Sequence, residues 1–366
     1  MKVLHFISGI RSGGVEQMLI NYTELLSDKY EYEEVIVYQH DPDMICLEKL
    51  QNAGNKCIRI ANKRIRPISN LIETYKIIKK ERPEVVHCHM SMLNFFPLII
   101  AKLCRVKVRI SHSHTSSGGV NFGPLNKLVK KLNMSLATHL MACGKDAGKY
   151  MYGKNKFSII RNAIDIDKFN YSELDNKTIR TKLEIPDDAF VMGNVGRFVN
   201  QKNHSRLIDI FEKFHQQKAN SYLIIIGDGE LLVDIERKIA KLNLRKFVKL
   251  VGTVSDVSKY LSTMDLFLLP SLYEGLPVVC VETQAMGVPL VLSKNIDSDI
   301  RLLNTTCCVS LDSDDAEWLN TINRVAGFKR VSDLRIKEIL IQNGFSIFDS
   351  FLELKEFYLE ALSKQN

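Results

Sequence analysis

Apolar strand-like runs alternate with helical patterns along nearly the whole chain of 366 residues. In the first half the strand-like runs are 3–8, 34–39, 56–61, 85–90, 106–111, 140–142 and 157–160. The pattern then restarts with runs at 190–195, 222–226, 248–251, 266–269 and 290–292. Parallel strands need long crossover connections, usually helices, so this alternation predicts βαβ units. The expected fold class is α/β, with two doubly wound, Rossmann-like domains that face each other across a cleft.

The segment 271–293 carries the strongest local signal for chemistry. It joins an apolar run (265–270) to a helix that Pro277 can open and then to a second apolar run (288–292). Glu274 lies in the loop, and Glu282 lies one to two turns inside the helix. The free N–H groups of a helix N-terminus attract phosphate, and carboxylates can accept hydrogen bonds from sugar hydroxyls. The segment therefore predicts a nucleotide-sugar pocket.

A basic pair follows the first strand of the second half. Arg197 and Lys202 stand five residues apart in a loop, where they can converge on a diphosphate. Arginine binds phosphate as a planar fork and lysine as a point charge. Positive charge at this place would stabilise a nucleoside diphosphate as it leaves. The alternative is two surface cations, in a chain that has 50 Lys and Arg.

The Glu-x7-Glu pattern of Glu274 and Glu282 stands inside Ser-x-x-Glu-Gly-x-Pro and is followed by Gly287-Val-Pro289. In this context it resembles the donor-site signature of the retaining glycosyltransferases of family 4. The resemblance implies a glycosyltransferase B fold and transfer of a hexose from a nucleoside-diphosphate sugar, expected to be UDP-linked, with retention at the anomeric carbon. It implies neither a cofactor nor a metal ion. The donor phosphate would take the acceptor proton during attack on the same face.

The resemblance also assigns the site residues. Donor binding falls to Gly14, Arg197, Lys202, Val254, Glu274, Gly275, Leu276 and Glu282, and catalysis to His114, Glu274, Arg197 and Lys202. The acceptor side falls to Gly13, Glu16 and His89. Gly13 and Glu16 form the Gly-Gly-x-Glu loop after the first strand together with the donor-side Gly14. The family usually has Gly after the lysine. Asn203-His204 stands here instead and resembles a subset tied to capsule and exopolysaccharide assembly.

Four histidines lie at strand ends of the first half, in the pairs His87/His89 and His112/His114. In the family, the histidine at the position of His114 contacts the transferred sugar. Histidines at His-x-His spacing could instead bind zinc, although no carboxylate or thiolate is arranged as a further ligand. We favour sugar contact for His114. For His89, packing and function stay equally open, and the scattered Asp-x-Asp pairs do not indicate a metal site.

Positive charge is concentrated in the first half. Residues 1–165 contain 25 Lys and Arg against 14 Asp and Glu, a net charge of +11, whereas residues 166–366 contain 25 against 28, a net charge of −3. Such asymmetry suggests a polyanionic partner, or only a solvated basic surface. The helical pattern 125–136 flanks apolar residues with Lys127, Lys130 and Lys131. We expect this region to bind an anionic membrane that carries a lipid-linked glycan acceptor, and not nucleic acid.

No signal peptide and no apolar run of about 20 residues stand out, so we expect a cytoplasmic protein at the inner face of the cell membrane. The eight cysteines show no metal spacing and are expected to be reduced, buried thiols. The polar stretch 167–188 is typical of a linker or hinge segment. We expect an acceptor-side domain (1–165), a donor-binding domain (166–344) and a tail helix (345–366) that packs on the first domain, as the resemblance implies. The alternatives are a nucleotide-sugar epimerase and a non-catalytic nucleotide-sugar-binding subunit.

Overall fold

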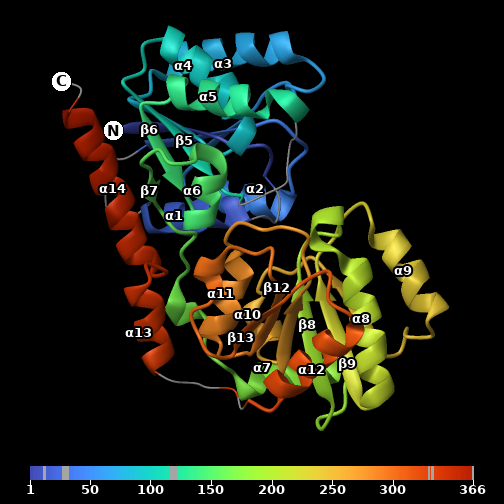
Figure 1. Ribbon diagram of the computed structural model, residues 1–366. Coiled ribbons are helices and arrows are strands. Elements are labelled where there is room, and N and C mark those ends of the chain that lie inside the picture. Colours follow the sequence, from blue (N-terminus) through green and yellow to red (C-terminus); the bar gives the residue numbers. More distant parts are fainter. Residues whose placement is uncertain (11–13, 27–32, 116–121, 329, 331–333, 365–366) are drawn as a thin grey trace. The chain divides into compact units, whose positions relative to one another are not determined.

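The computed structural model describes residues 1–10, 14–26, 33–115, 122–328, 330 and 334–364 (Figure 1). The chain forms two compact units, each built on its own parallel sheet. Unit 1 comprises Met1–Ala163 and Ile347–Asn366, and unit 2 comprises Ile164–Ser346. The α/β fold class with two doubly wound sheets is thus confirmed.

The sheet of unit 1 has the strand order β3-β2-β1-β4-β5-β6-β7, and all neighbouring strands run parallel. The strands are β1 (Lys2–Phe6), β2 (Glu33–Tyr38), β3 (Lys56–Arg59), β4 (Val85–Cys88), β5 (Val108–Ser113), β6 (His139–Ala142) and β7 (Ser158–Ile159). The winding direction reverses between β1 and β4. Loops that leave such a pair of strands diverge, so the carboxyl ends of β1 and β4 border a natural ligand position.

Helices cover both faces of this sheet. They are α1 (Gly14–Leu26), α2 (Met44–Asn52), α3 (Pro67–Glu81), α4 (Phe95–Leu103), α5 (Asn126–Leu136), α6 (Lys145–Tyr152) and α14 (Ile347–Ser363), with the short 3-10 helices η1 (Ser91–Asn94) and η2 (Gly123–Leu125). On one face, residues of α3, α4 and α5 pack against Leu4, Phe6 and Val86. On the other, α14 packs against Val3, Val85 and Val108.

Helix α14 returns to unit 1 from the far end of the sequence (Figure 1). Its buried hydrophobic residues are spaced alternately four and three apart: Ile347, Phe351, Leu354, Tyr358 and Ala361. This spacing places them on one stripe of the helix. The later part of the stripe packs on the valines of the central strands, whereas Ile347 and Phe351 pack with residues of α1 and α2.

The sheet of unit 2 has the order β10-β9-β8-β11-β12-β13, again with parallel neighbours. Its strands are β8 (Phe190–Val195), β9 (Ser221–Ile226), β10 (Val248–Gly252), β11 (Leu266–Leu269), β12 (Leu290–Ser293) and β13 (Thr306–Val309). Here the winding reverses between β8 and β11. The carboxyl ends of these two strands therefore border the corresponding ligand position in unit 2.

The helices of unit 2 are α7 (Glu173–Lys182), α8 (His204–Gln217), α9 (Leu232–Lys241), α10 (Ser258–Leu261), α11 (Val278–Ala285), α12 (Asp315–Ala326) and α13 (Leu334–Gln342), with η3 (Ile166–Lys168), η4 (Asn200–Lys202) and η5 (Ser298–Ile300). The core packs α8, α9 and α12 against the sheet, and it includes the fully buried Trp318.

The expected linker at 167–188 is wrong. Residues Glu173–Lys182 form helix α7, and Ser172 caps it by accepting a hydrogen bond from the backbone N–H of Asp175. The polar residues that suggested a loop are the cap and the acidic first turn of a helix, which interact favourably with its N-terminal N–H groups. The buried residues of α7 are Ile179 and Arg180.

Candidate active site

The predicted donor residues of unit 2 gather where the strand order reverses. Arg197 and Lys202 follow β8, and Glu274 follows β11, the strand paired with β8. The loops after β8 and β9 also approach closely, because a Cβ on Gly227 would lie 2.2 Å from the carbonyl oxygen of Gly196. Gly227 has a φ of 141°, which glycine adopts without strain. Residues far apart in the sequence thus share one edge of the sheet.

Glu274 is a buried carboxylate with several fixed partners. Its Oε1 lies 2.6 Å from Lys202 Nζ and accepts a hydrogen bond from Ser271 Oγ at 3.0 Å. Its Oε2 accepts from Gln201 Nε2 at 3.0 Å. A buried ion pair with such additional hydrogen bonds holds its groups in one geometry. Lys202, expected on a diphosphate, is therefore placed here against the carboxylate expected on the sugar.

Glu282 is also a buried carboxylate, but no described residue holds it in place. It is the fifth residue of α11 and is 8% exposed, yet its carboxylate has no hydrogen-bond or ion-pair partner among the residues that the structure describes. Burial raises its pKa to about 7. A buried carboxylate without a partner is costly and is suited to accept hydrogen bonds from ligand hydroxyls. The helix begins at Val278, with Pro277 one residue before it as the N-cap.

The backbone conformation at position 203 explains why asparagine can stand after Lys202, where the family usually has glycine. It lies between η4 and α8 with φ 54° and ψ 45°, the left-handed conformation that glycine adopts most easily and asparagine tolerates. Its Nδ2 also donates a hydrogen bond to the carbonyl oxygen of Pro270 at 3.1 Å. Asparagine thus keeps the backbone shape expected of glycine and ties the loop after β8 to the end of β11.

The remaining donor residues lie around the same edge. The half-buried Arg197 guanidinium has no hydrogen-bond or ion-pair partner within the described ranges. Val254 lies in the loop after β10, and the buried Gly275 and Leu276 lie between Glu274 and α11. Next to Lys202, His204 stacks on Phe198 with ring centroids 4.2 Å apart, and burial lowers its pKa to about 4.

The acceptor-side residues of unit 1 lie near the other reversal point. Gly14 begins α1 and Glu16 is in its first turn, whereas Gly13 lies outside the described residues. His89 follows β4, and His114 follows β5. His89 Nδ1 and His114 Nε2 are 2.9 Å apart, so the two candidates contact each other directly. Burial lowers the pKa of His114 to about 3.

These two histidines belong to a larger buried network. His5 Nδ1 lies 3.0 Å from His89 Nε2, and His5 Nε2 lies 3.1 Å from Glu34 Oε1. A second branch joins His112 Nδ1 to His87 Nε2 at 3.0 Å and His87 Nδ1 to the Tyr358 hydroxyl of α14 at 2.6 Å. His5, His87 and His112 lie two or four residues beyond Val3, Val85 and Val108 on β1, β4 and β5, so strand alternation places them on the face that α14 covers.

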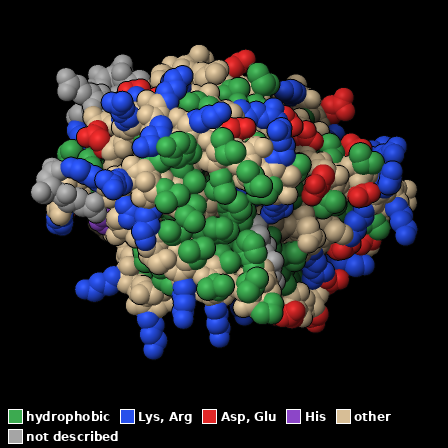
Figure 2. Space-filling model, turned by 90° about the horizontal axis from the view of Figure 1, so that it is seen from above, with side chains coloured by type: hydrophobic (Ala, Val, Ile, Leu, Met, Phe, Trp, Pro, Cys, Tyr) green, Lys and Arg blue, Asp and Glu red, His purple; other side chains and the backbone are tan. Residues whose placement is uncertain are grey.

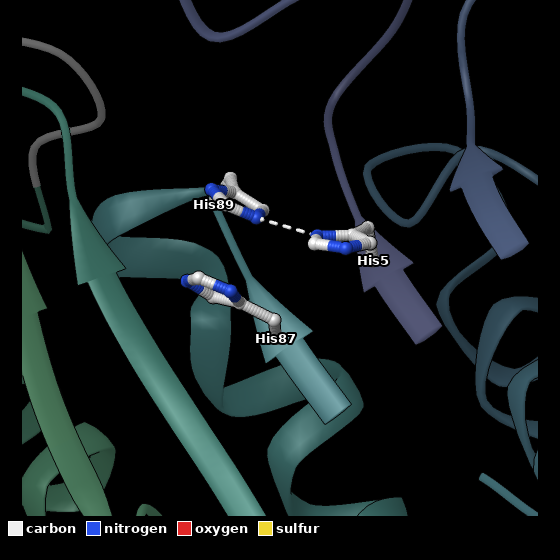
Figure 3. Close-up of side chains that lie close together, drawn as sticks. All are labelled: His5, His87 and His89. Atoms are coloured by element: carbon white, nitrogen blue, oxygen red, sulfur yellow. Dashed lines mark hydrogen bonds between the residues drawn. The ribbon is translucent and has the colours of Figure 1, made fainter. Parts of the chain in front are cut away.

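Two groups of three histidines place ring nitrogens within 4.8 Å of one another: His5, His87 and His89, and His89, His112 and His114. Metal ligation requires in-plane lone pairs that converge on one point. In Figure 3, His5 and His89 are instead hydrogen bonded to each other, and the ring of His87 is stacked on that of His89 with centroids 4.1 Å apart. Stacked rings direct their lone pairs along separate planes, so hydrogen bonding accounts for this geometry better than metal binding.

Sequence reasoning missed several partners. His5 and Glu34 were not identified, nor were the contacts that Gln201 and Ser271 make with Glu274. The sequence did contain a signal for the histidines. His87 and His89 are two residues apart in one predicted strand region, as are His112 and His114 in the next, and His5 lies in a third. A spacing of two places side chains on one face of a sheet. Glu34 comes from β2, and its contact with His5 depends on a register that the sequence does not reveal.

Two family models match the chain. The model described as Glycosyltransferase Family 4 matches residues 12–168, and the one described as Glycosyl transferases group 1 matches residues 175–298. The first covers most of unit 1 and the second covers the donor-site loops of unit 2.

Three curated relatives are similar over most of their length. EpsF of Bacillus subtilis (strain 168), which is named a glycosyltransferase, is 31% identical, covering 94% of this chain and 92% of its own. The Escherichia coli UDP-Gal:alpha-D-GlcNAc-diphosphoundecaprenol alpha-1,3-galactosyltransferase is 28% identical over 81% of each chain. The capsular polysaccharide biosynthesis glycosyltransferase CapH of Staphylococcus aureus is 25% identical over 98% of this chain and 99% of its own.

Among solved structures, Anabaena HepE in complex with UDP-glucose superposes with a TM-score of 0.78 at 18% identity, covering 100% of both chains. This likeness supports the glycosyltransferase B fold. Sequence, fold and relatives agree that the chain belongs to family 4 of the glycosyltransferases.

Proposed function

We propose that this protein transfers a hexose from a UDP-sugar, with retention at the anomeric carbon, to a glycan acceptor linked to a lipid diphosphate. One observation carries the donor half of the proposal. Glu274 is held by Lys202, Gln201 and Ser271, while Glu282, beyond the start of α11, is buried and has no hydrogen-bond or ion-pair partner among the described residues. The carboxylate of Glu274 is thus preorganised, whereas that of Glu282 is available to ligand hydroxyls.

In the donor complex, Glu282 accepts hydrogen bonds from the ribose and Glu274 accepts them from the transferred sugar. UDP is the expected nucleotide because HepE was solved with UDP-glucose and the Escherichia coli relative is named for UDP-Gal. Val254, after β10, borders the base, as in the resembled family. The two glutamates are assigned by their depth, because Glu282 lies inside α11 and Glu274 lies in the loop before the helix.

The reaction proceeds without a metal ion. Arg197, Lys202 and the N–H groups at the start of α11 carry the positive charge that stabilises the departing diphosphate. Lys202 has three donors, so it can retain Glu274 while it binds a phosphate oxygen. The acceptor hydroxyl attacks from the face that the diphosphate leaves, and a phosphate oxygen takes its proton. His114 contacts the sugar near the reacting carbon.

The acceptor half of the proposal rests on the surface of unit 1. Figure 2 looks onto the face that carries α3, α4 and α5, where hydrophobic side chains form a patch bordered by Lys and Arg. Exposed hydrophobic residues on these helices and on η2 are Ile68, Ile72, Tyr75, Ile99, Leu103, Leu125 and Leu128. An apolar patch with a basic border fits the surface of an anionic membrane.

We therefore place the protein at the cytoplasmic face of the membrane, bound peripherally through α3, α4 and α5. None of the helices in the described ranges combines the length and hydrophobicity of a membrane-spanning segment. The Escherichia coli relative is named for an acceptor on diphosphoundecaprenol, which lies in a membrane. Of the three lysines expected at this surface, Lys127 and Lys131 are exposed, whereas Lys130 donates to the carbonyl oxygen of Tyr150 and stacks over its ring.

The test is a transfer assay with a panel of nucleotide sugars and lipid-diphosphate-linked acceptors, with NMR analysis of the anomeric centre. We expect one UDP-sugar to yield a product that retains the donor configuration. Glu274→Gln should lower turnover strongly while the affinity for UDP stays close to that of the wild type. Inversion at the anomeric carbon would contradict the mechanism. Interconversion of donors without transfer would identify an epimerase, and donor binding without either reaction would identify a non-catalytic subunit.

A further inference from the structure

The loop 270–275, which carries Glu274 between β11 and α11, is held by hydrogen bonds from the loop after β8. Gln201 Nε2 donates to the carbonyl oxygen of Tyr273 at 3.0 Å and to Glu274 Oε2 at 3.0 Å. The backbone N–H of Leu272 donates in return to the carbonyl oxygen of Gln201 at 2.8 Å. The loop after β8 therefore fixes both the backbone of loop 270–275 and the carboxylate that this loop presents.

A second segment, 293–297 at the end of β12, holds the same loop from its other side. Strand β11 lies between β8 and β12 in the sheet, so the segments that follow these two strands flank the loop after β11. Ser293 Oγ donates to the carbonyl oxygen of Ser271 at 2.6 Å, and the backbone N–H of Asp297 donates to the carbonyl oxygen of Gly275 at 3.3 Å. These two contacts fix the beginning and the end of the loop.

Between them, Asn295 makes the two contacts that lie nearest to Glu274 in the sequence. Its Nδ2 donates to the carbonyl oxygen of Leu272 at 2.9 Å, and its own carbonyl oxygen accepts from the backbone N–H of Glu274 at 3.3 Å. Asn295 is exposed, so water can replace the side-chain bond and the bond adds little to global stability. Its effect is local, because it sets the course of the backbone next to the carboxylate.

We propose that Asn295 is a positioning residue for Glu274. Lys202 and Gln201 hold the carboxylate, and Asn295 holds the backbone from which this side chain extends. A misplacement of about 1 Å can lower turnover by roughly 100-fold, even when the altered residue lies away from the reacting atoms. The contact of Glu274 with the transferred sugar rests on the proposed function, whereas the hold of Asn295 on the loop does not.

The test variant is Asn295→Ala, and Asn343→Ala is its matched control. Asn343 is also an exposed residue of unit 2, and its Nδ2 donates to the carbonyl oxygen of Ile339 at 2.8 Å, just after α13. Neither asparagine has a positive φ, so alanine introduces no backbone strain at either position. Each variant therefore removes one exposed amide that donates to a backbone carbonyl, and only the first of them acts on the loop of Glu274.

Hydrogen exchange of the full-length, ligand-free protein tests the hold on the loop directly. In Asn295→Ala, peptides that cover 271–276 should exchange several-fold faster than in the wild type, because the loop opens more often and the amides of Leu272 and Glu274 lose protection. In Asn343→Ala, the same peptides should exchange at the wild-type rate. Wild-type exchange of these peptides in Asn295→Ala would overturn the proposal.

Steady-state kinetics test the consequence for catalysis. Asn295→Ala should lower kcat by roughly tenfold or more and keep the affinity for UDP within about twofold of the wild type, because UDP lacks the sugar that Glu274 contacts. Asn343→Ala should change neither quantity. A raised KM with unchanged kcat, or equal losses of kcat in both variants, would overturn the positioning role. The exchange measurement needs no substrate, so a protein that transfers no sugar would refute the proposed function and leave the contacts of Asn295 open to measurement.

Discussion

Among single residues, Glu282 gives the sharpest prediction, because its buried carboxylate has no hydrogen-bond or ion-pair partner within the part of the chain that the structure describes. Its folded-state pKa of about 7 lies above the ordinary 4.5, so folding favours the protonated form. Below pH 4.5 the carboxyl group is protonated in both the folded and the unfolded state and does not lower stability. As pH rises from 4.5 through 7, the unfolded state ionises more readily, so the free energy of unfolding falls. The difference corresponds to about 3 kcal/mol at most.

Glu282→Gln should consequently stabilise the ligand-free protein at pH 8 and have little effect near pH 4.5. The same change should weaken UDP binding by roughly 1–3 kcal/mol, because hydrogen bonds between the ribose and a charged group are lost. Thermal unfolding at the two pH values, with and without UDP, measures both effects. A variant that is less stable than the wild type at pH 8 would show that Glu282 has a structural partner.

At the scale of elements, the η4–α8 connection depends on the left-handed backbone of Asn203. Asn203→Gly should keep this conformation and lose only the bond to Pro270, whereas Asn203→Ala should cost a further 1–2 kcal/mol, roughly, because its Cβ clashes in that conformation. Urea unfolding followed by Trp318, the single tryptophan and a core residue of unit 2, reports both changes. Equal stability of the two variants would argue against a strained position.

The surface formed by α3, α4 and α5 leads to a second expectation at this scale. Sedimentation with anionic vesicles should show binding that falls as salt rises, since exposed basic residues near a membrane contribute about 1 kcal/mol each. Lys127→Glu with Lys131→Glu should weaken it. The matched control, Lys241→Glu with Lys246→Glu, makes the same charge change at exposed positions of unit 2 and should have no effect. Loss of binding in both double variants would indicate nonspecific attraction.

The strands and helices also show which parts of the fold can be predicted from sequence patterns. Strands were predictable wherever a buried run of β-branched residues stood between turns, as at Val85–Cys88 and Ser221–Ile226. The edge strand Thr306–Val309 was missed because its short Thr-Cys-Cys-Val run has little apolar contrast. Helix α7 was missed because its polar residues are caps and solvent-facing positions. In the site, chain-local features such as Glu274 and Glu282 were readable, whereas the contact of Glu34 with His5 depends on strand register.

For the molecule as a whole, the buried histidines make the two units respond differently to acid. Burial lowers the pKa of His87, His89 and His112 well below 6.5 and that of His114 to about 3. As pH falls below 6.5, the unfolded state takes up protons that folded unit 1 does not, so its stability declines. His114, with its pKa of about 3, contributes on the order of 2 kcal/mol at pH 5, and the other three histidines act in the same direction. In unit 2, the opposite effect of Glu282 offsets that of His204.

Hydrogen exchange of peptides from β4 and β5, corrected for the intrinsic rate, should therefore accelerate at pH 5 relative to pH 7.5. Urea unfolding of unit 2, followed by Trp318 emission, should change much less between the same pH values. Equal destabilisation of both units would mean that the histidine layer is already protonated or is open to solvent in the native protein.

The central claim is that the edge between β8 and β11 binds a nucleoside diphosphate through protein groups and without a metal ion. Calorimetric titration of UDP in the presence of a chelator tests it most directly, with Arg197→Gln and Glu282→Gln as the site variants and the exposed Arg245→Gln, next to the start of β10, as the control. We predict that UDP binds the wild type and the control equally and binds each site variant roughly tenfold or more weakly. Binding that appears only with added manganese or magnesium, or site variants that bind UDP like the wild type, would contradict the account.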